Sequence, residues 1–314
     1  MIIRSIVDRS EIDFLVSHSA KRDASARWVN GVLERGESSL KWCRMALSDG
    51  GQLLAAQVMD SWSPDDVPAD SPTFVQLLGH TDEQAAVALL ENDLHEFGTA
   101  RVDVRLVLDG DAPPELRSLR EDQQRVLALS GFTVDLDRVR LEWSGSALPI
   151  PAKRLTFRPA WTLARDRLVD MFAAVGDGAV DHGMVTDRAR FGRTEEAEVR
   201  LARLTRRTYE DDWFVVGVDA DGLLIGYVQA ALATGDNQAI LAEIGVVNSQ
   251  RGHRYVDDLL SYGTGVLASR GETRIRAYTD AGNHAMRAAF ARGGYAQTGF
   301  RRDFHRSANA PTPA

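Results

Sequence analysis

The stretch Arg251-Gly252-His253-Arg254-Tyr255-Val256 decides the fold of this chain, because it joins two segments of different periodicity. Residues 239–247 before it are apolar and β-branched, as in a buried strand. Residues 257–269 after it carry apolar side chains at helical spacing. A strand that ends in a glycine-containing loop and opens a helix leaves unpaired N–H groups at the positive end of a helix dipole. The pattern therefore predicts an anion site, suited to a pyrophosphate, at this turn.

A second motif follows in the sequence. Residues 273–279 read as a strand, Asn283 opens a helix, and that helix ends at Gly293-Gly294-Tyr295. In this order the two motifs resemble the acyl-CoA-binding half of the GNAT superfamily of N-acetyltransferases. The family's loop reads Arg/Gln-x-x-Gly-x-Gly/Ala, and its last helix reads Asn-x-x-Ala/Met-x-x-x-Tyr-x-x-x-Gly-Phe. Phe290 stands at the Tyr position of the helix motif, and Arg254 and Val256 stand where the loop usually has small residues.

The resemblance implies a site for acetyl-CoA as co-substrate. The residues carried over onto it are Val246, Val247, Arg251, Gly252, His253, Arg254, Tyr255, Val256, Asn283 and Phe290. The alternative is a degenerate loop in which Val256 crowds the pyrophosphate, while Asp257 and Asp258 repel it.

The chemistry implied by the resemblance is direct attack of an amine on the thioester. Glu243 interrupts an apolar strand, which costs desolvation energy unless the carboxylate is paired or faces a wet cleft. It is therefore the candidate general base, with a structural salt bridge as the alternative. Asn283 is the second catalytic candidate; it also suits a helix cap, a role that does not exclude the first. The general acid that would protonate the leaving thiolate is not identified, because Phe290 cannot donate a proton. The candidates near the motifs, none preferred by spacing, are Tyr255, Tyr262, Tyr278 and His284.

The chain is expected to contain two successive copies of the same domain plan. Residues 144–152 combine Gly, Ser and two Pro, which is typical of a linker. We expect an α/β (α+β) fold of two tandem acetyltransferase-type domains, each a mixed, mostly antiparallel sheet flanked by helices. The predicted divisions are a degenerate N-terminal domain, 1–143, the linker, a C-terminal domain with the acyl-CoA site, 153–306, and a disordered tail, 307–314.

The expected elements of each half follow from apolar periodicity and turn signals. For the first half they are strands 2–6, 74–78, 102–108 and 133–143, a hairpin through 49–51, and helices near 11–17, 25–33, 83–97 and 115–129. For the second half they are strands near 155–158, 213–218, 223–231, 239–247 and 273–279, a final strand ending near 304, and helices near 164–175, 195–208, after the loop and from 283.

The two halves are not expected to be equal. Where the second half has its Arg-Gly loop, the first half has Gly79-His80-Thr81-Asp82-Glu83-Gln84. Thr81 and Gln84 form a capping box, so their side chains would occupy the N–H groups that a pyrophosphate needs. We therefore expect the first half to be a structural partner that binds no CoA.

Composition restricts the partners. The 314 residues are 44% hydrophobic and 26% charged, and the formal net charge is −8. An acidic balance argues against nucleic acid and suits a cationic substrate. The chain has no run of about 18 apolar residues, so we expect no membrane span and a cytoplasmic protein. The single cysteine, Cys43, is expected to be a structural thiol on an edge or half-buried strand, and the seven histidines show no metal spacing. Arg200, Arg203, Arg206 and Arg207 are expected on a solvated helix face, with the alternative that part of this cluster faces the 3′-phosphate of CoA.

The sequence thus predicts acetyl transfer from acetyl-CoA to an amine of a small molecule. The alternatives are a catalytically silent binding or scaffold protein of this fold, an enzyme using another acyl donor, and a decarboxylase. In this fold the acceptor is recognised by loops that share no motif, so its identity does not follow from the sequence. The sequence does not indicate the oligomeric state either.

Overall fold

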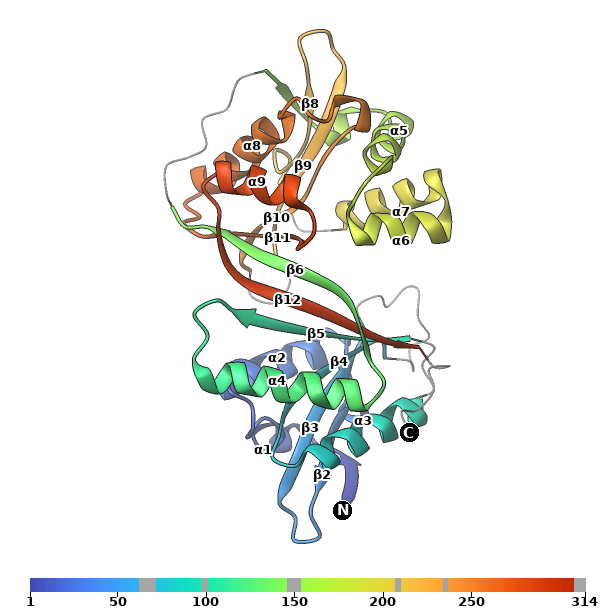
Figure 1. The fold of residues 1–314 in the computed structure, drawn as a ribbon, viewed down its shortest axis with the longest axis vertical. Coiled ribbons are helices and arrows are strands. Elements are labelled where there is room, and N and C mark those ends of the chain that lie inside the picture. The colour runs from blue at the N-terminus through green and yellow to red at the C-terminus, as the bar shows by residue number, and fades with distance from the viewer. Residues whose placement is uncertain (62–71, 98–100, 146–153, 207–209, 234–236, 308–314) are drawn as a thin grey trace. The chain divides into compact units, whose positions relative to one another are not determined.

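The computed structural model describes residues 1–61, 72–97, 101–145, 154–206, 210–233 and 237–307 (Figure 1). The chain forms two compact units. The first comprises Met1–Asp137 together with Phe300–Ala314, and the second comprises Arg138–Gly299. The predicted linker 144–152 and tail 307–314 lie almost entirely outside the described residues.

The first unit is a mostly antiparallel sheet with two pairs of helices. Its sheet order is β1-β2-β3-β4-β5-β12, with β4 and β5 parallel. The strands are β1 (Ile2–Ser5), β2 (Cys43–Leu47), β3 (Leu53–Asp60), β4 (Phe74–His80), β5 (Arg101–Asp109) and parts of β6 (Thr133–Trp143) and β12 (Ala296–Ser307). The helices are α1 (Ile12–Leu15), α2 (Arg22–Glu34), α3 (Glu83–Phe97) and α4 (Pro114–Leu129), with short 3-10 turns at Arg9–Glu11 and Leu40–Trp42.

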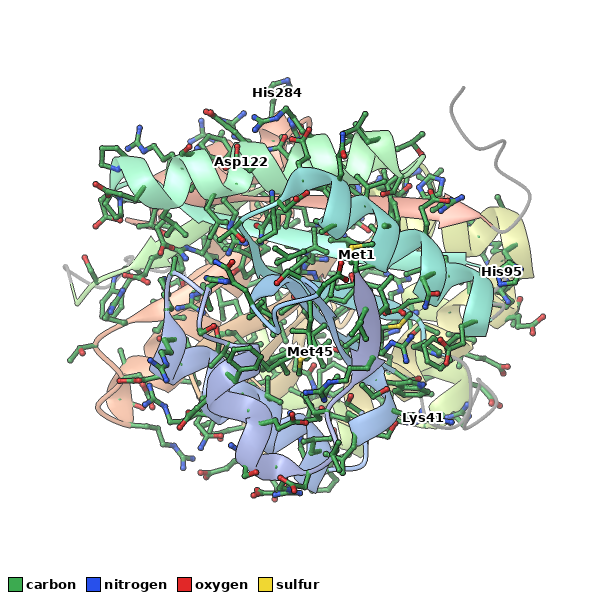
Figure 2. The ribbon with its side chains drawn as sticks, turned by 90° about the horizontal axis from the view of Figure 1, so that it is seen from below. Met1, Lys41, Met45, His95, Asp122 and His284 are labelled. Atoms are coloured by element: carbon green, nitrogen blue, oxygen red, sulfur yellow. The ribbon has the colours of Figure 1, made fainter. Side chains whose placement is uncertain are left out.

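Each face of this sheet has its own core. Leu89, Leu90 and Val126 bring α3 and α4 onto one face, and Leu15 and Val29 bring α1 and α2 onto the other. Figure 2 shows α3 and α4, which carry the labelled His95 and Asp122, above the strands, and the blue helices α1 and α2 below them. In Figure 2 the side chain of Met45 lies inside the unit, whereas Lys41 and His95 lie at its margin.

The cysteine prediction is confirmed in part. Cys43 is free and fully buried on β2, where burial raises the pKa of its thiol to about 12. A thiol that stays protonated is a poor nucleophile, so the structural role holds. The strand is not an edge, because β2 pairs with both β1 and β3.

The second unit repeats the plan. Its sheet order is β6-β11-β10-β9-β8-β7, with β10 and β11 parallel. The strands that it adds are β7 (Thr156–Pro159), β8 (Phe214–Val218), β9 (Leu224–Leu232), β10 (Ala239–Val246) and β11 (Ile275–Asp280). The helices are α5 (Arg165–Gly176), α6 (His182–Phe191), α7 (Arg193–Thr205), α8 (Tyr255–Ser269) and α9 (His284–Arg292), with short 3-10 turns at Ala160–Thr162 and Asn248–Gln250.

Helices cover both faces of the second sheet. Leu259 and Phe290 place α8 and α9 in one core, while Phe172 and Leu201 place α5 and α7 in the other. Figure 1 shows α8 and α9 on one side and α5 to α7 on the other. None of the helices described in either unit has the length and apolar character that crossing a bilayer requires.

Two features differ from the sequence prediction. No helix or strand was predicted between residues 176 and 194, where α6 lies. The long strands β6 and β12 each contribute to both units, so residues 138–143 group with the second unit and residues 300–307 with the first. The predicted division had placed each of these strands in a single domain.

Candidate functional site

A cavity of about 610 Å³ lies in the second unit, where two parallel strands part. Among the described residues, the ladder between β10 and β11 pairs only Ile240 with Arg276. Beyond this pair, residues 241–246 of β10 and Tyr278 and Thr279 of β11 line the cavity from opposite sides. The separation exposes one edge of β10, whose backbone is free to pair with an extended ligand.

The predicted anion loop lies at one end of this cavity. Gly252 has φ +83° and Arg254 has φ +59°, so the chain makes a left-handed turn into α8. Within the described part of the chain, the backbone N–H groups of residues 252–256 have no protein acceptor. Gly252, Arg254, Tyr255 and Val256 all line the cavity. A row of unpaired donors at a helix N-terminus can hold an anion such as a pyrophosphate.

The two acidic residues after the loop are neutralised. Arg154 donates to Asp258 at 2.6 Å and also to the carbonyl oxygens of His253 and Arg254, at 2.6 and 2.9 Å. Arg292 pairs with Asp257 at 2.6 Å. The repulsion considered in the sequence analysis is therefore offset by two arginines, and Arg154 also fixes the shape of the loop.

Arg251 has a different role from the one its position suggested. Its guanidinium donates to the carbonyl oxygens of Val175 and Gly178, the latter at 2.8 Å. It also donates to Asn248 Oδ1 at 3.1 Å. These bonds tie the loop to the end of α5, and they occupy donors that a phosphate would need. The side chain therefore supports the loop, although Arg251 lines the cavity.

The remaining predicted cofactor residues divide into two groups. Val246, Asn283 and Phe290 line the cavity. Val247 packs in the core beside α5, and His253 does not reach the cavity. Asn283 caps α9, since its Oδ1 accepts from the N–H of Met286 at 3.1 Å. Asn283 therefore caps α9 and also lines the cavity, so the two roles expected from the sequence are compatible.

Glu243 lies in the same cavity on β10, next to an irregularity in the pairing with β9. Its Oε1 accepts a hydrogen bond from the hydroxyl of Tyr227 on β9, and Arg200 Nη1 lies 3.6 Å from the same oxygen. Burial raises the pKa of Glu243, while Arg200 and the Tyr227 bond act in the opposite direction. A carboxylate with a raised pKa that still faces a cavity is suited to take a proton.

Arg200 corrects a sequence prediction. It is only 3% exposed and does not lie on a solvated face. Its guanidinium lies over the ring of Phe172, donates to the Tyr227 hydroxyl at 3.1 Å, and approaches Glu196 at 2.9 Å. Arg203, by contrast, is half exposed and pairs with Asp187. The prediction thus fails at Arg200, because this residue and Glu196 occupy the buried face of α7.

Sequence reasoning missed Tyr227 and the role of Arg200. Two signals were present: a tyrosine inside the apolar strand 224–232, and an arginine four residues after a glutamate on an amphipathic helix. Neither signal shows that both side chains meet the carboxylate of β10.

Of the four candidates for the general acid, two line the cavity. Tyr255 and Tyr278 line the cavity. Tyr262 donates to the carbonyl oxygen of Asp212 and stacks on Phe157, so it belongs to the core. His284 is exposed and does not line the cavity. Among the described residues, no group of three or more His, Cys, Asp or Glu is placed to hold a metal.

The corresponding helix start in the first unit is closed. The cap is Asp82, whose carboxylate accepts from the N–H of Ala85 at 2.9 Å, so the predicted capping box on Thr81 is wrong. The N–H groups of Thr81 and Asp82 both reach the carbonyl oxygen of Leu54. A Cβ on Gly79 would lie 2.4 Å from the carbonyl oxygen of His18, so backbone covers this strand end. At this helix start the backbone N–H groups of Thr81, Asp82 and Ala85 have protein acceptors, unlike the N–H groups of residues 252–256 in the second unit.

No protein-family model matches the chain, and no curated protein matches it. Solved structures do match. A GCN5-related N-acetyltransferase from Sphaerobacter thermophilus aligns with a TM-score of 0.63 at 14% identity, over 99% of this chain and 96% of that one. A tandem GNAT protein from the clavulanic acid biosynthesis pathway aligns with a TM-score of 0.58 at 16% identity, over 100% and 99% of the two chains. The fold is that of the GCN5-related N-acetyltransferases.

A third structure with this fold, the GCN5-related N-acetyltransferase from Kribbella flavida, aligns with a TM-score of 0.53 at 16% identity, over 91% of this chain and 95% of that one. The predicted fold class of two tandem acetyltransferase-type units is confirmed, because the tandem GNAT protein matches along the whole chain. At these identities the likeness concerns the fold, and the chemistry rests on the site.

Proposed function

We propose that this protein is an acyl-CoA-dependent N-acyltransferase that moves an acetyl group from acetyl-CoA to the amine of a small molecule. The observation that carries the proposal is the pairing of two features in one cavity. An open row of backbone N–H groups begins α8, and the carboxylate of Glu243 lies on the adjoining strand. The first suits a pyrophosphate and the second suits proton transfer.

The donor end is assigned to residues 252–256 and the free edge of β10. The N–H groups would hold the pyrophosphate, and the exposed side chain of Arg254 adds a positive charge beside it. The β10 edge would pair with the amide groups of the pantetheine arm, as one strand pairs with another. Asn283 lies where the cap of α9 meets the cavity and would contact the same arm.

The acceptor end is assigned to the cavity wall formed by α6, α7 and Glu243. Glu243 would take a proton from the ammonium group of the acceptor, directly or through water. The neutral nitrogen then attacks the thioester carbonyl and a C–N bond forms. The C–S bond breaks, the thiolate of CoA leaves, and the nitrogen loses its second proton to solvent to give the amide. Phe290 cannot protonate this thiolate. Tyr255 and Tyr278 line the cavity and have hydroxyl protons to give.

Calorimetry of the full chain with acetyl-CoA tests the donor assignment. We expect one site per chain. Turnover is then followed by release of free thiol in the presence of a panel of small primary amines, including diamines, amino sugars and amino acids. Binding without release in any mixture would favour the silent binding protein, and absence of binding would overturn the proposal.

A further inference from the structure

The first unit contains a second cavity, of about 320 Å³. It begins where β4 and β5 part, after the pairs Phe74–Asp103 and Val75–Val104. Residues 76–78 and 105–107 line it from the two strands, and α2 and α4 complete the wall. It therefore occupies the place in the first unit that corresponds to the acetyl-CoA cavity of the second.

This second cavity does not suit a nucleotide such as CoA. The helix that follows β4 starts with the carboxylate of Asp82 on its N–H groups. Gln123 extends from α4 into the gap and donates to the carbonyl oxygen of Leu77 at 2.8 Å. The strand edge on which a pantetheine arm would pair is thus already occupied by a side chain. A smaller ligand is required.

The lining has a one-sided charge. It contains the cations Lys21, Arg105 and Arg120, whereas no aspartate or glutamate is among the described residues that line it. Lys21 and Arg105 have carboxylate partners outside the cavity, Asp109 and Asp303, each at 3.3 Å.

Arg120 differs from the other two cations. Its Nε donates to the carbonyl oxygen of Val107 at 3.0 Å, and its Nη1 donates to Oε1 of Gln123 at 2.6 Å. These two neutral acceptors fix the orientation of the guanidinium. Among the described residues no carboxylate lies within ion-pair distance of it, and its Nη2 has no acceptor.

A half-buried guanidinium without an ion-pair partner among the described residues carries a desolvation cost. Burial lowers the pKa of Arg120, in opposition to the charge of Asp109. An anion placed at the free end of the guanidinium would remove that cost and gain a charge-assisted hydrogen bond. The side chain is already held by Val107 and Gln123, so little conformational entropy is lost on binding.

The rest of the cavity is apolar. Leu78, Leu106 and Leu116 are buried in its wall, and the half-buried Trp28 adds an aromatic side. We propose that the first unit binds a small organic carboxylate, whose charged group meets Arg120 while its apolar body lies against Trp28 and the leucines. The inference does not depend on acetyl transfer in the second unit.

Fluorine NMR of the full chain labelled with 5-fluorotryptophan tests this proposal. The chain has six tryptophans, and the Trp28→Phe variant assigns the Trp28 resonance. The probes are acetate, butyrate and benzoate, each compared with its neutral amide. We expect the carboxylates with larger bodies to shift the Trp28 resonance at concentrations where the amides do not. Equal shifts for acid and amide, or no shift with any carboxylate, would overturn the proposal.

Variants of α4 locate the site. Arg120→Gln should weaken carboxylate binding roughly tenfold to a hundredfold. The matched control is Arg117→Gln, one turn earlier, whose guanidinium donates to Ala112 and Gly110 outside the cavity. Its affinity should equal that of the wild type. Unchanged affinity in Arg120→Gln would contradict the site, and so would loss of the Trp28 shift when acetyl-CoA saturates the second unit. The comparison of acid and amide in the wild type stands even if Arg120→Gln fails to fold.

Discussion

The hydroxyl of Tyr227, on β9, donates a hydrogen bond to Oε1 of Glu243 on the neighbouring strand β10. Tyr227 is fully buried and does not line the cavity, whereas Glu243 does. The same hydroxyl accepts from Arg200 at 3.1 Å. The carboxylate that faces the cavity is therefore oriented from behind by a buried tyrosine, and Arg200, which itself lines the cavity, holds the same pair. Tyr227 and Arg200 are positioning residues in this arrangement.

The first prediction is that Tyr227→Phe moves the acid limb of the rate profile to higher pH. The Tyr227 bond stabilises the ionised carboxylate and so lowers the pKa of Glu243, against the upward effect of burial. Without it the pKa rises, and Glu243 is protonated over a wider range of pH. The measurement is kcat against pH with acetyl-CoA and an accepted amine. A variant that loses the same fraction of kcat at every pH would show only a structural role for Tyr227.

Glu243→Gln provides the second prediction. The amide keeps the shape of the side chain but cannot accept a proton, so kcat should fall by ~10²–10⁴. The acid limb of the profile should also disappear. Affinity for acetyl-CoA, measured by calorimetry, should change little, because the donor end lies at residues 252–256. Turnover at the wild-type rate would remove Glu243 from the mechanism.

The sequence predicted strands 74–78, 102–108, 239–247 and 273–279 and the helix after the Arg-Gly loop, because these elements have strong local signals. It predicted Glu243 as well, since a carboxylate in an apolar strand is conspicuous. It did not predict α6, whose polar residues give no clear apolar stripe and leave it without a fully buried side chain.

The partners within the site were beyond local sequence patterns. Arg154 lies about a hundred residues before the loop that it supports, and Arg251 reaches back to the end of α5. The sequence shows an arginine in the loop motif but not which acceptors its guanidinium meets. The same limit applies to Thr81 and Asp82, where two neighbouring residues both suit a cap and only geometry selects Asp82.

A third prediction concerns Gly252. Gly252 lines the cavity with φ +83°, and no atom lies within 4 Å of the place where a Cβ would stand, so a side chain there would occupy open space beside the loop. Gly252→Leu should weaken acetyl-CoA binding by tenfold or more as it displaces the phosphates from the loop. Gly222→Leu is the matched control, because Gly222 has φ +81° and equally open space but does not line the cavity. Equal affinity in both variants would place the phosphates elsewhere.

Arg254→Glu is a fourth, independent test of the donor end. The side chain of Arg254 is exposed and lines the cavity, and reversing its charge should weaken acetyl-CoA binding by roughly tenfold to a hundredfold. The loss should shrink at high salt, since exposed charges are screened. Removal of the 3′-phosphate from the ligand shows whether Arg254 contacts that group or the pyrophosphate. An affinity that is unaffected by the charge reversal at any salt concentration would contradict this assignment.

The fifth prediction addresses stability in the first unit. Asp60 is 1% exposed, and its two carboxylate oxygens have no partner among the described residues. Burial raises its pKa from 3.8 to about 7. The folded state therefore holds this proton more tightly than the unfolded state does, so the free energy of unfolding should fall as pH rises from about 4 to 7. The full loss is on the order of 4 kcal/mol.

Asp60→Asn removes this titration. The variant should be more stable than the wild type by a few kcal/mol at pH 8 and should show almost no difference at pH 4, where the wild-type carboxyl is already neutral. Urea unfolding at the two pH values measures both quantities. Asp111→Asn, on an exposed turn of the same unit, serves as the control and should leave the pH dependence as in the wild type. A stability difference for Asp60→Asn that is the same at pH 4 and pH 8 would show that the buried carboxylate is neutralised by a partner in the folded state.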